Sequence, residues 1–225
     1  MIDLKEFKVS KNLITYLDQA SGTSEAYRIL RTNINYALRN SKTKSIIITS
    51  PGISDGKTVT ACNLAICMAN EENRVLLIDA DLRKPTVHKQ FKIPNYTGLS
   101  NILLEDVDIN EALHNISYVS NLTILTSGLI PKNPSELVSS SRMKELLNIL
   151  INKFDIIIID TPPAGYVSDA AILSSLVGGV ILAIAEGKTK IGVAKHAVKT
   201  LQNVNTNLLG VVMTKVNIKN SGYYY

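Results

Sequence analysis

The chain of 225 residues is long enough for one domain with a full core, and 45% hydrophobic and 19% charged residues are typical of a globular protein. The net charge of +5 contains no block of like charges, so neither a nucleic-acid nor an anionic-membrane interface is favoured, and we expect no nucleic-acid partner. The longest apolar stretch, residues 177–185, is far shorter than the roughly 20 residues that span a bilayer, so we expect a cytoplasmic protein.

Short apolar, β-branched runs alternate with helix-like segments along the chain. The predicted strands are 45–49, 74–79, 122–126, 154–160, 179–185 and 208–214. The predicted helices are 25–39, 57–71, 135–152, 167–177 and 189–204. We expect Thr23 or Ser24 to cap the first of these, and Ser135 to begin the third. Several strands are apolar throughout, as parallel strands are when both faces are covered. The order predicts an α/β fold with a mostly parallel sheet and helices on both faces, in a single domain over residues 1–220.

The segment Ser50–Thr58 joins the first predicted strand to a helix and ends in Gly-Lys-Thr. This is the context of a phosphate-binding loop, in which backbone N–H groups converge on phosphate oxygens. Lys57 adds a positive charge, and the Thr58 hydroxyl can ligate Mg²⁺. We therefore expect a nucleoside triphosphate and Mg²⁺ to bind to Gly52, Ser54, Asp55, Gly56, Lys57, Thr58 and Val59.

The loop departs from the common pattern G-x-x-x-x-G-K-[ST], because its first position is Pro51. An ordinary glycine turn before a helix is the alternative interpretation. Two acidic motifs that follow in the expected order favour the phosphate-binding loop.

Both acidic motifs place carboxylates at the ends of predicted strands. Asp79 and Asp81, within LLIDADLRKP, end one hydrophobic strand, and Asp160, the last residue of FDIIIID, ends another. Ligands of α/β proteins bind at the carboxyl ends of such strands. One carboxylate of the first motif could hold a magnesium-bound water while the other orients or deprotonates a hydroxyl. The Asp160 segment is a Walker B arrangement, which makes Thr58, Asp79 and Asp160 the expected metal-site residues. Arg83 is a candidate for organising the acidic pair or for contacting phosphate.

The segment TKVN at 214–217 follows the last predicted strand. In related GTPases the equivalent loop ends in Asp, which binds guanine. An amide at Asn217 suits the edge of adenine, so Lys215 and Asn217 are expected to contact the base and ATP is preferred over GTP. A polar surface loop is the alternative.

The loop, DADLRKP and IIIIDTPP together resemble the cytoplasmic bacterial tyrosine kinases of capsule and exopolysaccharide synthesis. The resemblance covers nearly the whole chain. It implies a P-loop NTPase-like fold, ATP and Mg²⁺ as cofactors, and protein tyrosines as acceptors. Lys57, Asp79, Asp81 and Asp160 would be the catalytic residues, with Asp79 preferred as the base.

Three further segments favour these kinases. EAYRILR matches the family's E-x-x-R-x-x-R, so Glu25, Arg28 and Arg31, in the helix 25–39, are expected to join subunits into a ring. GLIPKNPSELVSS resembles the family's Asn-Pro-Ser-Glu-Leu segment. Residues 221–225 form a tyrosine-rich tail, in which Tyr223, Tyr224 and Tyr225 are the expected phosphoacceptors for neighbouring subunits. The alternatives are an exposed helix with an internal ion pair for the first segment, a loop and helix start for the second, and a disordered chain end for the third.

The resemblance also implies a membrane-bound activator that acts through its cytoplasmic segment, so the kinase would work at the inner face of the membrane. The family's loop usually has Pro-Gly just before the last x-Gly-Lys, where this chain has Ile53-Ser54. A position there that needs positive φ would suit Ser54 less well than Gly. Alternative functions are a partition-type ATPase, disfavoured because the loop lacks an early Lys, and a nucleotide-gated scaffold without catalytic activity.

Overall fold

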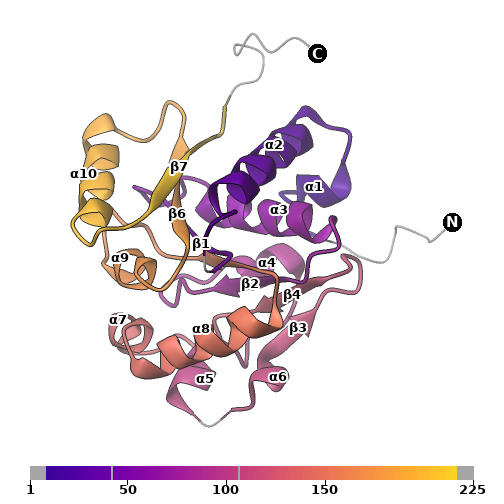
Figure 1. The fold of residues 1–225 in the computed structure, drawn as a ribbon, viewed down its shortest axis with the longest axis vertical. Helices are drawn as coiled ribbons and strands as arrows, with labels where there is room; N and C mark the ends of the chain where they lie inside the picture. Colours follow the sequence, from indigo (N-terminus) through magenta and orange to yellow (C-terminus); the bar gives the residue numbers. More distant parts are fainter. Residues whose placement is uncertain (1–8, 42, 106, 217–225) are drawn as a thin grey trace, which may run out of the picture.

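One seven-stranded sheet organises the computed structural model, which describes residues 9–41, 43–105 and 107–216. Its strands are β1 (Ser45–Thr49), β2 (Val75–Asp79), β3 (Leu113–Asn115), β4 (Leu122–Leu125), β5 (Ile156–Asp160), β6 (Gly179–Ala185) and β7 (Leu208–Thr214). The order is β3-β4-β2-β5-β1-β6-β7, and every neighbouring pair is parallel except β3 with β4. The expected α/β class with a mostly parallel sheet is confirmed (Figure 1).

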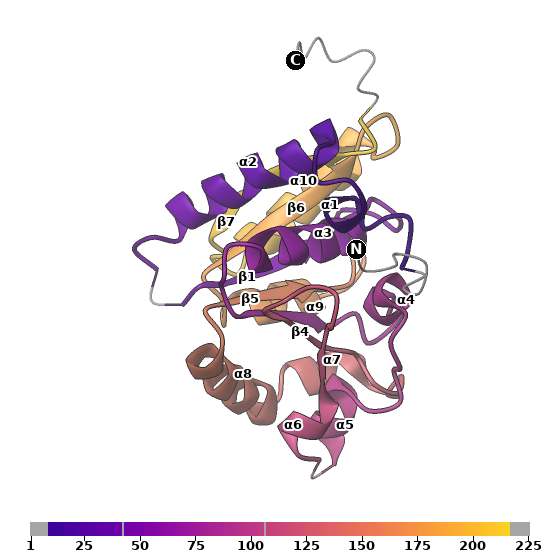
Figure 2. The same cartoon turned by 90° about the vertical axis from the view of Figure 1, so that its right-hand side faces the viewer.

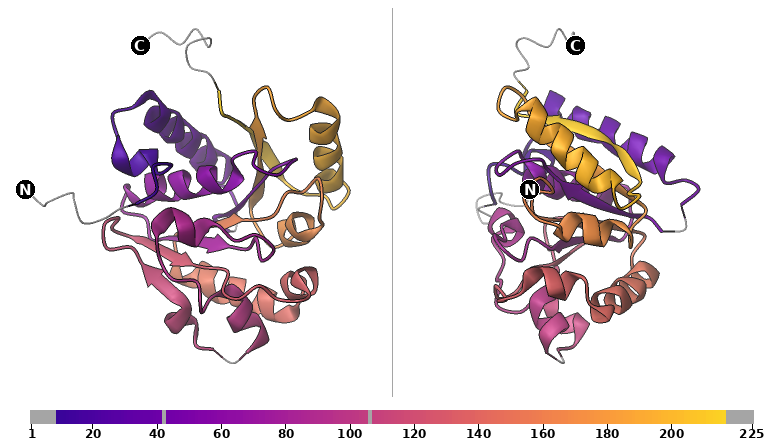
Figure 3. Two further views of the ribbon diagram at one scale, coloured as in Figure 1. Left: turned by 180° about the vertical axis from the view of Figure 1, so that it is seen from behind. Right: turned by 90° about the vertical axis from the view of Figure 1, so that its left-hand side faces the viewer.

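Helices cover both faces of the sheet, as expected (Figures 2 and 3). One face carries α1 (Ile14–Leu17), α2 (Gly22–Ala37), α3 (Lys57–Ala69) and α4 (Val87–Phe91). The other carries α5 (Leu99–Leu104), α6 (Ile109–Ala112), α7 (Pro134–Val138), α8 (Ser141–Lys153), α9 (Asp169–Ser174) and α10 (Ile191–Gln202). Side chains of a strand alternate between the faces, so Ile46 and Ile48 enter one core cluster and Ile47 enters the other.

Two predicted helix starts are wrong. The first helix begins at Gly22, because the Ser21 hydroxyl, rather than that of Thr23 or Ser24, accepts the capping hydrogen bond. The predicted helix 135–152 is two helices, since Ser140 has extended backbone angles and caps α8 by accepting from the Met143 N–H. Ser135 therefore lies inside the first turn of α7, and the cap position is Asn133.

The strand order predicts where a ligand binds, at the carboxyl end of β1. This strand lies between β5 and β6, so the connection from β1 to β2 and the connection from β5 to β6 run toward opposite edges of the sheet. A crevice forms at such a switch point, outside the carboxyl ends of the strands. Among the described residues, no helix is both long and apolar enough to cross a bilayer.

An ion pair joins the amino ends of β2 and β5. The Arg74 guanidinium donates to both carboxylate oxygens of Asp155, at 2.7 and 3.1 Å, and the Arg74 backbone N–H donates at 2.8 Å. These hydrogen bonds, from the side chain and then the backbone of Arg74, lower the pKa of Asp155 to about 2. The pair is half-exposed, which limits its contribution to stability.

We predict that Asp155→Asn lowers the free energy of unfolding at pH 6 by at most about 1 kcal/mol, the value typical of an exposed pair. Because the folded-state pKa lies below the unfolded value, this stability is complete above pH about 4 and is lost as the pH falls toward 2. Urea denaturation at pH 6, 4 and 3 should therefore show a difference from wild type that shrinks with falling pH. The control is Asp18→Asn, whose exposed carboxylate has no ion pair within the described residues. An unchanging difference would contradict the assignment.

Candidate functional site

The phosphate-binding loop ends where α3 begins. Gly56 is the cap residue, with φ of +94°, a conformation that favours glycine. Within the described residues no acceptor is hydrogen-bonded to the N–H groups of Gly56, Lys57, Thr58 or Val59. These four donors, at the positive end of the helix dipole, form a cradle suited to an anion.

Contacts inside the loop and with neighbouring loops fix its backbone. The buried Asp55 carboxylate accepts from the Gly52 N–H at 2.7 Å. Ser54 has φ of +62°, which confirms the expected positive-φ position. Lys188 donates to the Ile53 carbonyl at 3.1 Å. Lys215 donates to the Ser54 carbonyl at 2.7 Å, so this predicted base-contacting residue holds the loop.

The segment after β5 supports the start of the loop. The Ala164 N–H donates to the Ser50 carbonyl at 2.9 Å. Gly165 packs directly on Pro51, since a Cβ at this glycine would lie 2.2 Å from the Pro51 carbonyl oxygen. The residue that departs from the common loop pattern is thus packed against the Walker B segment.

Lys57 lies among the predicted carboxylates. Its Nζ is 2.8 Å from Asp81 Oδ2 and 3.4 Å from Asp160 Oδ1. The Thr58 hydroxyl donates to Asp160 Oδ2 at 2.6 Å. Asp79 and Asp160 are opposite each other in the parallel pairing of β2 and β5. The structure therefore brings together all four predicted catalytic residues and Thr58.

Burial and the neighbouring charges shift the pKa values of this cluster. Burial, with the repulsion of Asp160, raises the pKa of Asp79 to about 8. Burial also raises the pKa of Asp160, against the attraction of Lys57. Burial alone would lower the pKa of Lys57, but the nearby carboxylates, Asp160 first, outweigh it and the pKa is raised. Lys57 therefore stays charged.

The two carboxylates of the first acidic motif have different surroundings. Asp79 accepts from the N–H groups of Asp81, Thr86 and Val87 at 3.0 to 3.2 Å and is fully buried. From the described part of the chain Asp81 accepts one backbone N–H, that of Lys84 at 3.0 Å, and its other oxygen accepts from Lys57 Nζ at 2.8 Å. Asp79 thus shapes the loop that leads into α4, while Asp81 faces the phosphate-binding loop.

Arg83 is hydrogen-bonded to neither Asp79 nor Asp81, the acidic pair that it was expected to organise. Its Nε donates to Asp169 Oδ2 at 2.9 Å, and its Nη2 donates to the Ser135 hydroxyl at 2.7 Å. Ser135 also donates to Asp169 at 2.6 Å. Asp169 opens α9 and is buried, and an acidic residue at a helix start ordinarily indicates only a favourable dipole contact, so sequence reasoning missed it.

The predicted oligomerisation residues divide into two groups. Glu25 and Arg28 form a half-exposed ion pair on α2. Arg31 instead donates to the Cys67 carbonyl at 3.0 Å and pairs with Glu71 at 2.8 Å. Arg31 is thus used within the chain, to hold α2 against the end of α3. Asn217 and Tyr223–Tyr225 lie outside the described residues.

The residues present fit a nucleotide with Mg²⁺. The N–H cradle and Lys57 suit phosphate oxygens, and the two carboxylates of Asp81 and Asp160 carry more negative charge than the single ammonium of Lys57 offsets, which suits a divalent cation. Within the described chain, no three His, Cys, Asp or Glu side chains form a group that could hold a metal by themselves. Mg²⁺ usually keeps waters and substrate phosphates beside one or two protein ligands.

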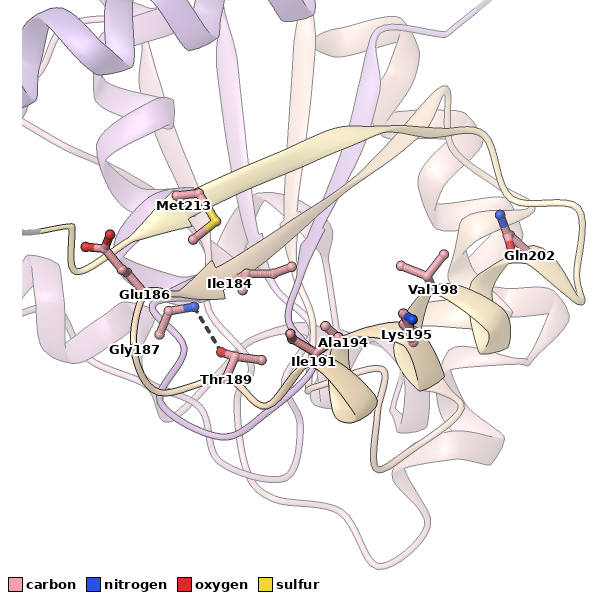
Figure 4. A pocket seen from close by; sticks show the side chains of 11 residues that line it. Ile184, Glu186, Gly187, Thr189, Ile191, Ala194, Lys195, Val198, Gln202 and Met213 are labelled. Carbon is pink, nitrogen blue, oxygen red and sulfur yellow. Dashed lines mark hydrogen bonds between the residues drawn. The ribbon is translucent and has the colours of Figure 1, made fainter. Parts of the chain in front are cut away.

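A separate pocket of about 570 Å³ lies between β6, β7 and α10 (Figure 4). Its lining is largely apolar and includes Ile184, Ile191, Val198 and Met213. None of the clustered carboxylates, nor Lys57, lines it. This pocket is distinct from the carboxylate cluster.

Comparisons with known proteins agree with this geometry. A protein-family model described as "AAA domain" matches residues 42–216. Tyrosine-protein kinase YwqD of Bacillus subtilis (strain 168) is 42% identical over 219 residues, which cover 97% of this chain and 92% of YwqD. A crystal structure of the chimerical protein CapA2B2 has a TM-score of 0.86 at 35% identity, covering 91% of this chain and 89% of the chimera.

The kinase domain of Escherichia coli tyrosine kinase ETK also has a TM-score of 0.86, at 30% identity, covering 95% of this chain and 84% of that domain. The phosphate-binding loop, the two acidic strand ends and these similarities lead to the same family. The chain belongs to the bacterial tyrosine-protein kinases with a P-loop domain, and it is a protein-tyrosine kinase.

Proposed function

We propose that this kinase transfers the γ-phosphoryl group of ATP, with Mg²⁺, to Tyr223, Tyr224 and Tyr225 of a neighbouring copy, and so regulates capsule and exopolysaccharide synthesis and export. The observation that carries the proposal is the meeting of Lys57 with Asp81 and Asp160 beside the N–H cradle of α3. Such an arrangement performs phosphoryl transfer by positioning and electrostatic stabilisation.

Each side chain has a role that follows from its contacts. The N–H groups of residues 56–59 and the Lys57 ammonium bind the phosphates and stabilise the charge that develops on them. Thr58 and Asp160, already hydrogen-bonded to each other, would hold Mg²⁺, and Asp79 lies beside them. When bound, Mg²⁺ supplies positive charge to the phosphate oxygens.

Asp81 is the carboxylate best suited to orient the acceptor hydroxyl. The sequence favoured Asp79, but both oxygens of Asp79 accept backbone N–H groups. Asp81 Oδ2 would become available once Lys57 turns toward phosphate. A tyrosine hydroxyl has a pKa near 10, so the carboxylate accepts the proton only as the oxygen attacks.

The partners of the kinase follow from its family. The half-exposed ion pair of Glu25 and Arg28 would join a neighbouring copy in a ring, while Arg31 orients α2 from within the chain. A membrane-bound activator would recruit the kinase to the inner face of the membrane through its cytoplasmic segment. Asn217 would contact the adenine base, and so would the aliphatic part of the Lys215 side chain, whose ammonium holds the loop.

We predict that Lys57→Met lowers autophosphorylation at least about 100-fold, the cost of losing one transition-state charge donor. Intact-mass measurement after incubation with ATP and Mg²⁺ should show increments of one phosphate on residues 223–225 in wild type and almost none in the variant. Lys144→Met, an exposed change on α8, is the matched control and should behave as wild type. ATP hydrolysis without any phosphotyrosine would contradict the proposal and favour a partition-type ATPase.

Substitutions of Asp79, the last residue of β2, and of Asp81, two residues after it, should have different effects. Asp81→Asn should lower kcat by about 100-fold or more, within the range of general-base loss, while ATP affinity changes little. Asp79→Asn should also lower the melting temperature, because a buried carboxylate that accepts three N–H groups is replaced. Calorimetric ATP titration and thermal melting beside the kinetics would distinguish the two effects. An Asp81→Asn enzyme with normal kcat would refute the assignment.

The positive φ of Ser54 in the phosphate-binding loop leads to a further prediction. Ser54→Gly relieves a positive φ and should stabilise the protein by up to about 1 kcal/mol. If the loop is thereby held more firmly in its binding conformation, affinity for ATP rises as well. Ser120→Gly changes an exposed serine whose φ is not positive and should instead be neutral or slightly destabilising. Equal effects of the two glycines on urea denaturation would show that Ser54 is not strained.

A further inference from the structure

Two adjacent loops at the carboxyl edge of the sheet expose large apolar side chains. Tyr96, before α5, is 80% exposed, and Leu129 and Ile130, after β4, are 60% and 65% exposed. We call these three residues the acceptor platform. β4 pairs with β2, so the loop that carries Leu129 and Ile130 begins about 4.8 Å, one strand spacing, from the strand that ends at Asp79.

The backbone beneath the platform is held by partly buried hydrogen bonds. The Asn95 amide donates to the Gly128 carbonyl at 2.9 Å and accepts from the Gly128 N–H at 3.0 Å. The Ser100 hydroxyl donates to the Leu129 carbonyl at 2.6 Å. Gly98 packs so closely that a Cβ there would lie 2.3 Å from the Gly128 nitrogen. Apolar side chains on an immobile backbone bind at low entropic cost.

The platform is also tied to the catalytic loop. Ser135, at the start of α7, accepts from Arg83, and both bind the buried Asp169. Arg83 is two residues from Asp81, so these bonds tie the start of α7, five residues after Ile130, to the loop that carries the carboxylate facing Lys57. The loop that carries Leu129 and Ile130 and the loop that carries Asp81 are therefore connected through one hydrogen-bonded network.

We propose that the acceptor platform binds the tyrosine cluster 223–225 of a second copy of this chain and presents one hydroxyl to Asp81. This inference rests on the proposed function. The three consecutive tyrosines offer apolar rings with polar tips, which suit an apolar surface beside a carboxylate. In the transfer step the bond between the γ-phosphorus and the β–γ bridging oxygen breaks, a bond from phosphorus to the tyrosine oxygen forms, and the phenolic proton passes to Asp81. ADP and phosphotyrosine are the products.

The strand order favours a second copy over the chain's own tyrosines. β7 is four strands from β2, about 19 Å, and the strands between them include β1, which leads into the phosphate-binding loop. Residues 217–223 span at most about 25 Å when fully extended. The chain's own Tyr223 would therefore have to cross the proposed ATP site almost fully extended.

The test separates enzyme copies from acceptor copies of the full chain. Enzyme copies carry Tyr223→Phe, Tyr224→Phe and Tyr225→Phe, and acceptor copies carry Lys57→Met. Leu129→Ser with Ile130→Ser is placed first in the enzyme copy and then in the acceptor copy. The matched control is Leu104→Ser with Ile149→Ser, two side chains that are 53% and 45% exposed on α5 and α8. Phosphotyrosine formation is followed against acceptor concentration.

The platform change in the enzyme copy should raise KM for the acceptor about tenfold, which corresponds to about 1.4 kcal/mol of binding free energy. The KM for ATP and the melting temperature should stay unchanged, and the same change in the acceptor copy should have no effect. An unchanged acceptor KM would overturn the platform and leave the kinase proposal intact. Equal effects from both copies would overturn it in favour of a general contact between subunits. If enzyme copies with an intact platform transferred no phosphate to the acceptor copies, both the proposed function and the platform would be overturned.

Discussion

The ammonium of Lys57, held among buried carboxylates, is the interaction on which the site depends. A buried charge is costly unless it is paired, and here Asp81 and Asp160 supply the pairing at 2.8 and 3.4 Å. Parallel pairing of β2 with β5 sets Asp79 opposite Asp160, so the sheet itself brings the acidic residues to one point. α3 then delivers Lys57 and Thr58 to that point, because the phosphate-binding loop ends at its first turn.

The same arrangement explains how one buried cluster can serve a transfer reaction. The carboxylates hold Lys57 charged, and the charge is therefore available to phosphate oxygens as soon as they compete for it. Asp79 is committed to the backbone of the following loop, which keeps Asp81 at a fixed place. Arg83 and Asp169 extend this network to the start of α7, so the loop after β2 and the segment that follows β4 are held together by connected hydrogen bonds.

The sequence predicted the features that depend on local pattern. Apolar runs indicated six of the strands, and the order Gly-Lys-Thr, Asp79–Asp81, Asp160 predicted a cluster that the structure brings together. Contacts between residues far apart in the sequence could not be predicted from it. Arg83 pairs with Asp169, 86 residues away, and nothing near either residue signals the other. The break before α8 depends on which of three consecutive serines caps a helix, and helix propensity does not distinguish them. The short β3 was missed because its three residues owe their conformation to pairing with β4.

The most direct test of this account is a crystal structure of the full chain with a non-hydrolysable ATP analogue and Mg²⁺. The account predicts that Lys57 Nζ leaves Asp81 for the β- and γ-phosphate oxygens, that Mg²⁺ lies beside Thr58 and Asp160, and that Asp81 faces the γ-phosphate. A bound analogue with Lys57 still paired to Asp81, or with its phosphates away from the N–H groups of residues 56–59, would contradict it.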